Sequence, residues 1–436
     1  MKAPFKKSLL SFSILLLCAA CASRPYAYVD KPVHAGDFKG SIGVLESNKS
    51  SLYQSQDKVL YYLDKGMLSH YAGEYDESIG LLQSAEQGIQ AAFTKSVTME
   101  IGSYIVNDMA QEYPGEDYED IYIKTFNALN YYHKGELESA LVEIRGMSLK
   151  LDGLAAKYAG LIAKMQEEAR RSGAPVTDSK VATTFSNSAL GCYLSMLFYR
   201  GTGDPNAEVD WRNLRKAFTD APALYNFPVP STIEDELEIP KGKARLNIVG
   251  FSGLSPVKEE HVVRIPLPSF GWIKIATPVL VSRPSAVHRI EVVFENGDRH
   301  PLELLENIEA IASETFKAKA SLIYTKSVVR ATIKGVTASA MSTAAEEADD
   351  ATASLLLGVF GLGAQIFAEA SEQADLRISR YFPARAYVTG ITLDPGIYSF
   401  SVNYYDGRGR LIESFLFEHV SVNENELNLK EAVCVR

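Results

Sequence analysis

Cys21 is the residue whose type and position most directly indicate chemistry. Three lysines lie within the first seven residues, the run from Leu9 to Leu17 is largely apolar, and two alanines precede the cysteine. A basic, then apolar, then small-residue order is typical of an export signal. The apolar run is about nine residues long, whereas a membrane-spanning helix needs about 20. We therefore expect residues 1–20 to be a signal peptide that is removed.

The chemistry expected at Cys21 is lipid attachment to its sulfur. The sequence LCAAC resembles the lipobox, although Cys18 stands where leucine is usual and Leu17 is displaced by one position. Cys18 is a poor acceptor, because bulky Leu17 would occupy its cleavage position. Two or more acyl chains anchor a protein stably, and Ala22 in place of aspartate resembles outer-membrane sorting. We predict a lipid anchor at Cys21 on the periplasmic face of the outer membrane; the alternative is cleavage to a soluble periplasmic protein.

The remaining groups that could do chemistry are scattered. Only Cys192 and Cys434 would remain unmodified after cleavage and lipid attachment. They could form a disulfide with each other, or Cys192 could be a buried free thiol within its apolar run. Neither the cysteines nor the seven histidines have zinc-ligand spacing. The sequence lacks GxSxG, HExxH, Walker and SxxK motifs. We therefore expect no metal, no cofactor and no small-molecule substrate, with an unrecognised cell-wall-acting enzyme as the alternative.

The net charge of the chain limits the classes of partner that it could bind. The net charge is −10, and loss of three signal lysines gives −10 − 3 = −13. An acidic chain without a basic stripe argues against nucleic acid. We expect the membrane, through the lipid, and envelope proteins as partners.

A helical repeat is the main organising element of the first half. The segment GMLSHYAGEYDESIGLLQSA (66–85) is echoed by ALNYYHKGELESALVEIRGM (128–147), with Gly73 aligned to Gly135. The small residues permit close helix approach, and both glycines are placed to end the first helix of a hairpin. The pattern resembles the tetratricopeptide hairpin. An extra helix (91–110) and a degraded third copy (189–218) complete a predicted repeat domain over 53–221.

Aromatic residues on the first helices of these hairpins are the candidate partner-binding groups. Repeat proteins commonly present a concave face to an extended or helical partner segment. Core packing is the alternative for about half of them. The candidates are Tyr62, Tyr71, Tyr131 and Tyr132.

The rest of the mature chain predicts a tether, a linker and a β-rich domain. Residues 21–52 are rich in Ser, Gly and Pro and fit a tether, and 222–243 a linker. Period-two strands with turns at Glu295 to Asp298 and Asp406 to Gly409 predict an antiparallel β-sandwich-like domain over 244–436. A long helical hairpin is expected to be inserted at about 304–374. Its second helix holds the apolar stretch 355–368, which is either buried or contacts a partner or membrane. The fold class is therefore α+β.

Two charged clusters have structural explanations. In YPGEDYED, we expect Asp117 to cap the following helix, with Asp120 three residues later. Lys258 and its neighbours Glu259 and Glu260 fit a solvated hairpin tip better than a recognition loop.

Three longer stretches, 115–151, 253–268 and 372–396, together resemble a family of tetratricopeptide lipoproteins of proteobacteria. They include GEDYEDIYIKTFNALNYYHKGELESALVEIRG, GLSPVKEEHVVRIPLP and EQADLRISRYFPARAYVTGITLDPG. The resemblance implies a lipidated N-terminus, a helical-repeat domain and a β-rich C-terminal region, and it carries no activity. It also implies partners such as other lipoproteins or cell-wall synthesis factors. We therefore expect a non-catalytic scaffold of the cell envelope.

Overall fold

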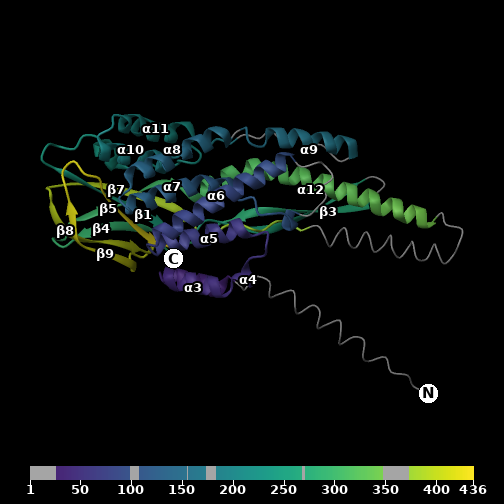
Figure 1. Cartoon of the computed structure of the whole chain (residues 1–436), viewed down its shortest axis with the longest axis horizontal. Helices are drawn as coiled ribbons and strands as arrows, with labels where there is room; N and C mark the ends of the chain where they lie inside the picture. Colours follow the sequence, from purple (N-terminus) through teal and green to yellow (C-terminus); the bar gives the residue numbers. More distant parts are fainter. Residues whose placement is uncertain (1–25, 99–107, 155, 173–182, 268–270, 347–372) are drawn as a thin grey trace, which may run out of the picture.

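The protein is mixed α+β, as the sequence predicts. The computed structural model describes residues 26–98, 108–154, 156–172, 183–267, 271–346 and 373–436. Helices of the first half cover one face of a β-sheet from the second half, and a second sheet packs on the opposite face (Figure 1). The described part is therefore layered as helices, sheet and sheet.

Three helical hairpins build the helical layer. Glycines with φ of +76°, +78° and +71°, at Gly73, Gly135 and Gly203, follow the first helix of each hairpin, as a left-handed residue after a helix does. A Cβ on Gly66 would lie 2.8 Å from Leu82 Cδ2, so any side chain there would crowd Leu82. The predicted hairpins are confirmed as hairpins, while their tetratricopeptide type stays a prediction. They are α5 (Lys58–Tyr71) with α6 (Tyr75–Thr98), α7 (Asp117–His133) with α8 (Leu137–Leu154), and α10 (Ala189–Thr202) with α11 (Asn206–Asp220).

The separate helix expected over 91–110 is wrong in its first part. Helix α6 runs without a break through residue 91 to Thr98, because no turn signal interrupts AEQGIQAAF. Residues 99–107 lie outside the described residues, and a short 3₁₀ turn, η3, covers Asp108–Ala110.

The predicted tether over 21–52 is wrong for most of its length. Residues 27–52 form α2 (Ala27–His34), α3 (Phe38–Ser47) and α4 (Lys49–Leu52). Val29, Val33 and Leu45 are fully buried against the main core. Val29 and Val33 have the four-residue spacing of one helix face, but Pro32 and the nearby glycines weakened this signal in the sequence. Residues 27–52 therefore belong to the folded body rather than to a tether.

The first sheet lies in the middle of the molecule. Its order is β10 (Asn428–Cys434), β1 (Ala244–Ser252), β7 (Arg385–Leu393) and β6 (Glu303–Asn307). Strand β10 pairs with β1 in parallel, whereas the other pairs are antiparallel. The β10–β1 pair is the exception to the antiparallel pairing that the sequence predicted for this domain, since period-two patterning does not encode strand direction.

The second sheet is antiparallel and uses both predicted turns. Its order is β5 (Arg299–Pro301), β4 (Arg289–Phe294), β8 (Gly396–Tyr405) and β9 (Leu411–Val422). The turn at Glu295 to Asp298 joins β4 to β5, and the turn at Asp406 to Gly409 lies between β8 and β9. Both hairpin predictions are confirmed.

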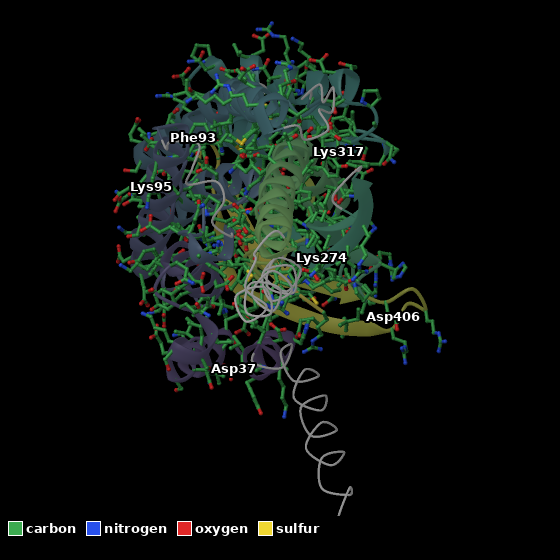
Figure 2. All side chains as sticks on the ribbon, turned by 90° about the vertical axis from the view of Figure 1, so that its right-hand side faces the viewer. Asp37, Phe93, Lys95, Lys274, Lys317 and Asp406 are labelled. Atoms are coloured by element: carbon green, nitrogen blue, oxygen red, sulfur yellow. The ribbon has the colours of Figure 1, made fainter. Side chains whose placement is uncertain are left out.

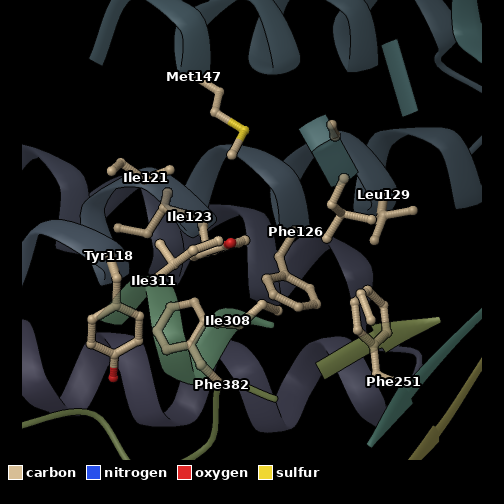
Figure 3. Close-up of a cluster of buried hydrophobic side chains, with 14 of the residues drawn as sticks. Tyr118, Ile121, Ile123, Phe126, Leu129, Met147, Phe251, Ile308, Ile311 and Phe382 are labelled. Atoms are coloured by element: carbon tan, nitrogen blue, oxygen red, sulfur yellow. The ribbon is translucent and has the colours of Figure 1, made fainter. Parts of the chain in front are cut away.

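Strand β1 is buried on both faces and connects the two halves. Leu246 and Ile248 pack in the core between the sheets, whereas Val249 and Phe251 pack in the core shared with the helices. Phe251 and Phe126 have ring centroids 5.3 Å apart, and Figure 3 shows Phe382 in the same cluster. The helical and β-rich parts therefore share one core.

The segment predicted as the linker 222–243 is packed rather than extended. It contains the 3₁₀ helix η4 (Ser231–Glu236), in which Ile233 and Glu236 are fully buried. Its proline content is typical of a linker, but its apolar residues pack between the helices and the sheet.

A long arm projects from the layered body (Figure 1). It consists of α12 (Ile308–Glu346), the two-stranded ribbon β2 (Val257–Leu267) with β3 (Gly271–Val281), and α9 (Ala159–Ser172). The first inserted helix begins at Ile308, because Leu304 belongs to β6. The apolar stretch 355–368 lies outside the described residues. Within the described ranges, no helix has the length and apolarity that a bilayer crossing requires.

Candidate functional site

The predicted lipid attachment residue, Cys21, lies outside the described residues. Two other cysteines are described: Cys192 in α10 and Cys434 in β10 are both buried free thiols. The Cys192 sulfur donates to Asn187 Oδ1 at 3.1 Å. The structure therefore supports the buried-thiol alternative and contains no bridge between these two residues.

Two of the four candidate tyrosines bind the chain's own backbone. The Tyr71 hydroxyl donates to the carbonyl oxygen of Tyr381 at 2.8 Å. The Tyr132 hydroxyl accepts from the backbone N–H of Leu429 at 3.0 Å and lies 3.2 Å from the carbonyl oxygens of Leu427 and Leu429. These contacts hold α5 to the segment before β7 and α7 to β10, which favours the core-packing alternative for Tyr71 and Tyr132, while a partner role for them stays a prediction.

The other two tyrosines, Tyr62 and Tyr131, are half-buried. Tyr62 packs beside the Tyr61 ring with centroids 5.7 Å apart, and the Tyr131 hydroxyl accepts from Gln83 Nε2 at 3.2 Å. A partner role for these two stays a prediction.

A buried ionic cluster closes the inner face of the first two hairpins. His70 Nε2 lies 2.8 Å from Glu431 Oε1, and His133 Nε2 lies 3.0 Å from Glu431 Oε2. Glu431 comes from β10, so the predicted concave face is occupied by the protein's own sheet. The sequence did not indicate that His70 would pair with an acid 361 residues further along the chain.

The hydrogen bonds around His70 favour its protonated form. Ser78 Oγ donates to the Gly66 carbonyl, and Asn130 Nδ2 donates to Ser78 Oγ at 2.9 Å. Asn130 Oδ1 is thereby left to accept from His70 Nδ1 at 2.7 Å, while Glu431 accepts from Nε2. Although burial favours the neutral ring, the Glu431 carboxylate raises the pKa of His70 and His70 in turn lowers the pKa of Glu431. Both ring nitrogens thus face acceptors, an arrangement that favours the protonated ring.

The acidic cluster at Tyr113 to Asp120 is structural. Glu116, not Asp117, occupies the position before α7, and Glu119 Oε2 accepts from the Glu116 N–H at 2.7 Å and from the Tyr113 hydroxyl at 2.8 Å. Burial raises the pKa of Glu119 to about 7. The predicted cap is therefore shifted by one residue, because Asp117 instead binds Lys157 Nζ at 2.6 Å.

Glu306 is a further buried acid with a structural role. Its carboxylate accepts from the hydroxyls of Tyr122 at 2.5 Å, Tyr225 at 2.7 Å and Ser188 at 2.7 Å. Burial raises the pKa of Glu306. Glu306 therefore connects β6 to α7 and to the start of α10 by hydrogen bonds, which stabilises the contact between the sheet and the helices.

An open groove of about 590 Å³ lies on the outer side of the hairpins, between α6, α7 and α8. Ile89, Ile121 and Leu154 line its base as buried side chains, and Leu149 at its edge is 74% exposed. Nothing lies within 4 Å of a Cβ built on Gly153, so the groove has free space there.

The charged groups lining this outer groove are paired with one another. Lys124 Nζ lies 2.8 Å from Glu86, Lys150 Nζ lies 2.6 Å from Asp120, and Lys157 pairs with Asp117. The charged side chains at the sides of the groove thus neutralise one another, and the side chains at its base are apolar.

A second, more enclosed cavity of about 300 Å³ lies where the arm meets the helices. Side chains of α6, α9, β3 and α12 line it, together with residues before α7. In Figure 2 the labelled Phe93 and Lys95 mark α6, and Lys317 marks α12. Lys258, expected at a solvated tip, is instead buried and donates to Glu116 Oε1 at 2.5 Å and to the Arg377 carbonyl at 2.9 Å.

The sequence did not lead us to predict the basic residues of this cavity. Lys319, Lys326 and Arg330 share one face of α12 by their spacing of seven and four residues. That spacing could have predicted a basic face on this helix. The acids that face them come from distant parts of the chain, which periodicity does not reveal.

Comparison of the chain with family models, with curated proteins and with solved structures finds no match. The resemblance to tetratricopeptide lipoproteins therefore stays a prediction from the sequence.

Proposed function

We propose that this protein is a non-catalytic scaffold of the cell envelope, anchored to the outer membrane by lipid on Cys21 and facing the periplasm. It binds an apolar segment of an envelope protein in the groove between α6, α7 and α8. This outer groove replaces the concave face that the sequence suggested, because the inner face already holds β10.

The observation that carries this proposal is the exposed Leu149 beside a groove whose charges are already paired. Leu149 is 74% exposed and Val142, seven residues earlier on the same face of α8, is 65% exposed. Burying such side chains contributes about 25 cal/mol per Å² of apolar surface. A partner segment therefore gains most by presenting apolar side chains, since the groove's ion pairs leave little charge to match.

The position of the folded body supports a scaffold close to the bilayer. Only residues 22–25 separate Cys21 from Tyr26, the first described residue. At about 3.5 Å per residue, five steps of chain reach at most about 17 Å. A lipid on Cys21 would keep the body beside the membrane, where other anchored envelope proteins lie.

Site-specific photo-crosslinking tests the groove. With p-benzoylphenylalanine in place of Leu149, we expect a discrete adduct with an envelope protein in cells. The same probe at Leu416, which is 65% exposed on β9, serves as the control position. An equal adduct from both positions would argue against a specific groove.

Filling the groove provides the matched pair of variants. Gly153→Trp places a ring in the groove, whereas Gly80→Trp places one on α6 at a glycine that also has no atom within 4 Å and does not line the groove. We expect Gly153→Trp to abolish the Leu149 adduct and Gly80→Trp to leave it unchanged. Turnover of purified peptidoglycan by the full chain, without any adduct, would favour the cell-wall enzyme instead.

A further inference from the structure

The outer side of α2 and α3 is a surface that the groove of the proposed function does not use. Val29 and Val33 of α2 and Leu45 of α3 are fully buried on the main core, so the opposite sides of both helices face outward. In Figure 1, α3 lies along one side of the body next to α5, whereas α8 and α11 lie along the other side. This surface therefore lies apart from the groove at Leu149.

The acids of this N-terminal segment are largely neutralised by cations from elsewhere in the chain. Residues 26–58 contain four lysines and four acids, so the segment is neutral in sequence. One acid, Asp37, accepts from the backbone N–H of Gly40 at 2.8 Å at the start of α3. The other three form ion pairs outside the segment: Asp30 with Arg380 at 2.6 Å, Glu46 with Lys65 at 2.9 Å and Asp57 with Arg377 at 3.0 Å.

The four lysines of the segment, in contrast, face solvent without an acidic partner. All four are exposed, and within the described ranges none of them belongs to an ion pair. They are Lys31, Lys39, Lys49 and Lys58. Lysines of the helical hairpins differ, because Lys65 and Lys134 each pair with two acids. The fold thus gives a segment that is neutral in sequence a basic outer surface.

Three exposed side chains, Tyr28, Lys31 and Lys39, form what we call the basic face. Tyr28 and Lys31 are three residues apart and share one side of α2, and Lys39 lies in the first turn of α3. Tyr28 is 68% exposed. Tyrosine rings favour the interface between membrane and water, and lysine stems can lie along apolar surface while the ammonium group stays solvated. These residue types are suited to a lipid surface.

The length of chain between Cys21 and α2 keeps the basic face within reach of the bilayer. Tyr26 lies at most about 17 Å from Cys21. A helix rise of about 1.5 Å per residue adds about 8 Å to reach Lys31. A lysine beside an anionic membrane strengthens binding by roughly fivefold. Although the chain is acidic overall, salt screens the repulsion from its distant acids beyond about 10 Å.

We propose that the basic face docks on a bilayer surface that contains anionic phospholipid, with Lys31 and Lys39 against lipid phosphates and Tyr28 in the headgroup layer. Docking on this side turns α8 and α11 away from the membrane, so the groove at Leu149 stays open to a partner. The inference rests on the proposed function only for the lipid anchor that brings this face to the bilayer.

Lysine acetylation on vesicles tests the docking. The chain from Cys21 onward is coupled through that thiol to a maleimide phospholipid in preformed vesicles, since Cys192 and Cys434 are buried. A membrane-impermeant acetylating ester then modifies exposed lysines, and mass spectrometry gives the rate at each one. On vesicles with phosphatidylglycerol, we expect Lys31 and Lys39 to react about fivefold more slowly than on phosphatidylcholine alone. High salt should remove this protection.

Two exposed lysines elsewhere serve as internal controls. Lys216 on α11 has a side chain that is 67% exposed, and Lys241 is exposed between η4 and β1. Both should react at the same rate on the two kinds of vesicle. Rates at Lys31 and Lys39 that do not depend on phosphatidylglycerol, or equal protection of Lys216, would overturn the proposal.

Single charge reversals test the location of the contact. Lys31→Glu should abolish the protection of Lys39, and Lys39→Glu should abolish that of Lys31, because each leaves an acid facing the anionic lipid. Lys216→Glu changes the net charge by the same amount and should leave both lysines protected. An equal loss of protection in Lys216→Glu would assign the effect to overall charge and contradict a specific face.

The design separates this inference from the proposed function. The maleimide tether replaces the acyl chains, so the acetylation rates do not depend on whether Cys21 is acylated in cells. The adduct expected from Leu149 likewise does not depend on Lys31 or Lys39. If the tethered chain shows no protection on phosphatidylglycerol, the docking is wrong while the anchor and the groove remain as proposed.

Discussion

At the scale of single residues, long-range ion pairs determine how the helices meet the sheet. Glu431 of the last strand lies within 3.0 Å of both His70 and His133, and Arg377 pairs with Asp57 at 3.0 Å. These partners lie hundreds of positions apart. The sequence could suggest that each side chain is packed, but not which group it contacts.

Removing Glu431 should destabilise the protein in a pH-dependent way. The pKa of His70 is raised above 6.5 in the folded chain, so its stabilising contribution is complete below pH 6.5 and is lost as pH rises through the raised value. We expect Glu431→Gln to lower the unfolding free energy by about 3 kcal/mol at pH 6. The difference from wild type should shrink towards pH 9.

Urea unfolding from pH 6 to pH 9 measures this effect. Glu418→Gln is the matched control, because Glu418 is exposed on β9. A loss for Glu431→Gln that stays constant over this pH range would show that His70 is not charged through Glu431.

At the scale of elements, local sequence signals predicted the helical hairpins and the β-turns, whereas the N-terminal helices and the parallel strand pair depend on tertiary contacts. The glycine-terminated helices and both β-turns follow directly from residues such as Gly135 and Gly297, which have φ of +78° and +90°. The helices of 27–52 were missed because their stability comes from burial on the core and from contacts such as Asp30 with Arg380 at 2.6 Å. Parallel pairing of β10 likewise depends on the path of the chain, not on strand composition.

Close packing within the first hairpin gives a second prediction. A methyl group on Gly66 would meet Leu82, whereas one on Gly80 in α6 would meet nothing within 4 Å. We expect Gly66→Ala to cost about 1–3 kcal/mol of unfolding free energy through overpacking. Gly80→Ala should stabilise by up to about 1 kcal/mol, because alanine favours a helix over glycine. Thermal unfolding of both variants measures this, and similar shifts for the two would contradict close approach at Gly66.

At the scale of the whole molecule, the central sheet makes the helical and β-rich parts one folding unit. Phe251 of β1 is fully buried among helical residues, including Phe126 of α7. The sequence predicted two domains because the change of period near residue 244 is sharp. Periodicity marks where elements change, but it does not show whether their apolar faces are shared.

Phe251→Ala should therefore weaken both parts together. We expect a loss of about 3–5 kcal/mol, typical of a large aromatic removed from a core. Hydrogen exchange followed by mass spectrometry should show faster exchange in α7 as well as in β1 and β7. Protection of α7 that stays at the wild-type level while the strands lose theirs would indicate independent domains.

Mass spectrometry of the N-terminal peptide of the mature protein, purified from its own membranes, tests the membrane anchor most directly. We expect the mature chain to begin at Cys21 and to carry acyl chains there, with Tyr26 five residues downstream. A mature N-terminus at another residue, or an unmodified Cys21, would contradict a scaffold held at the outer membrane by lipid.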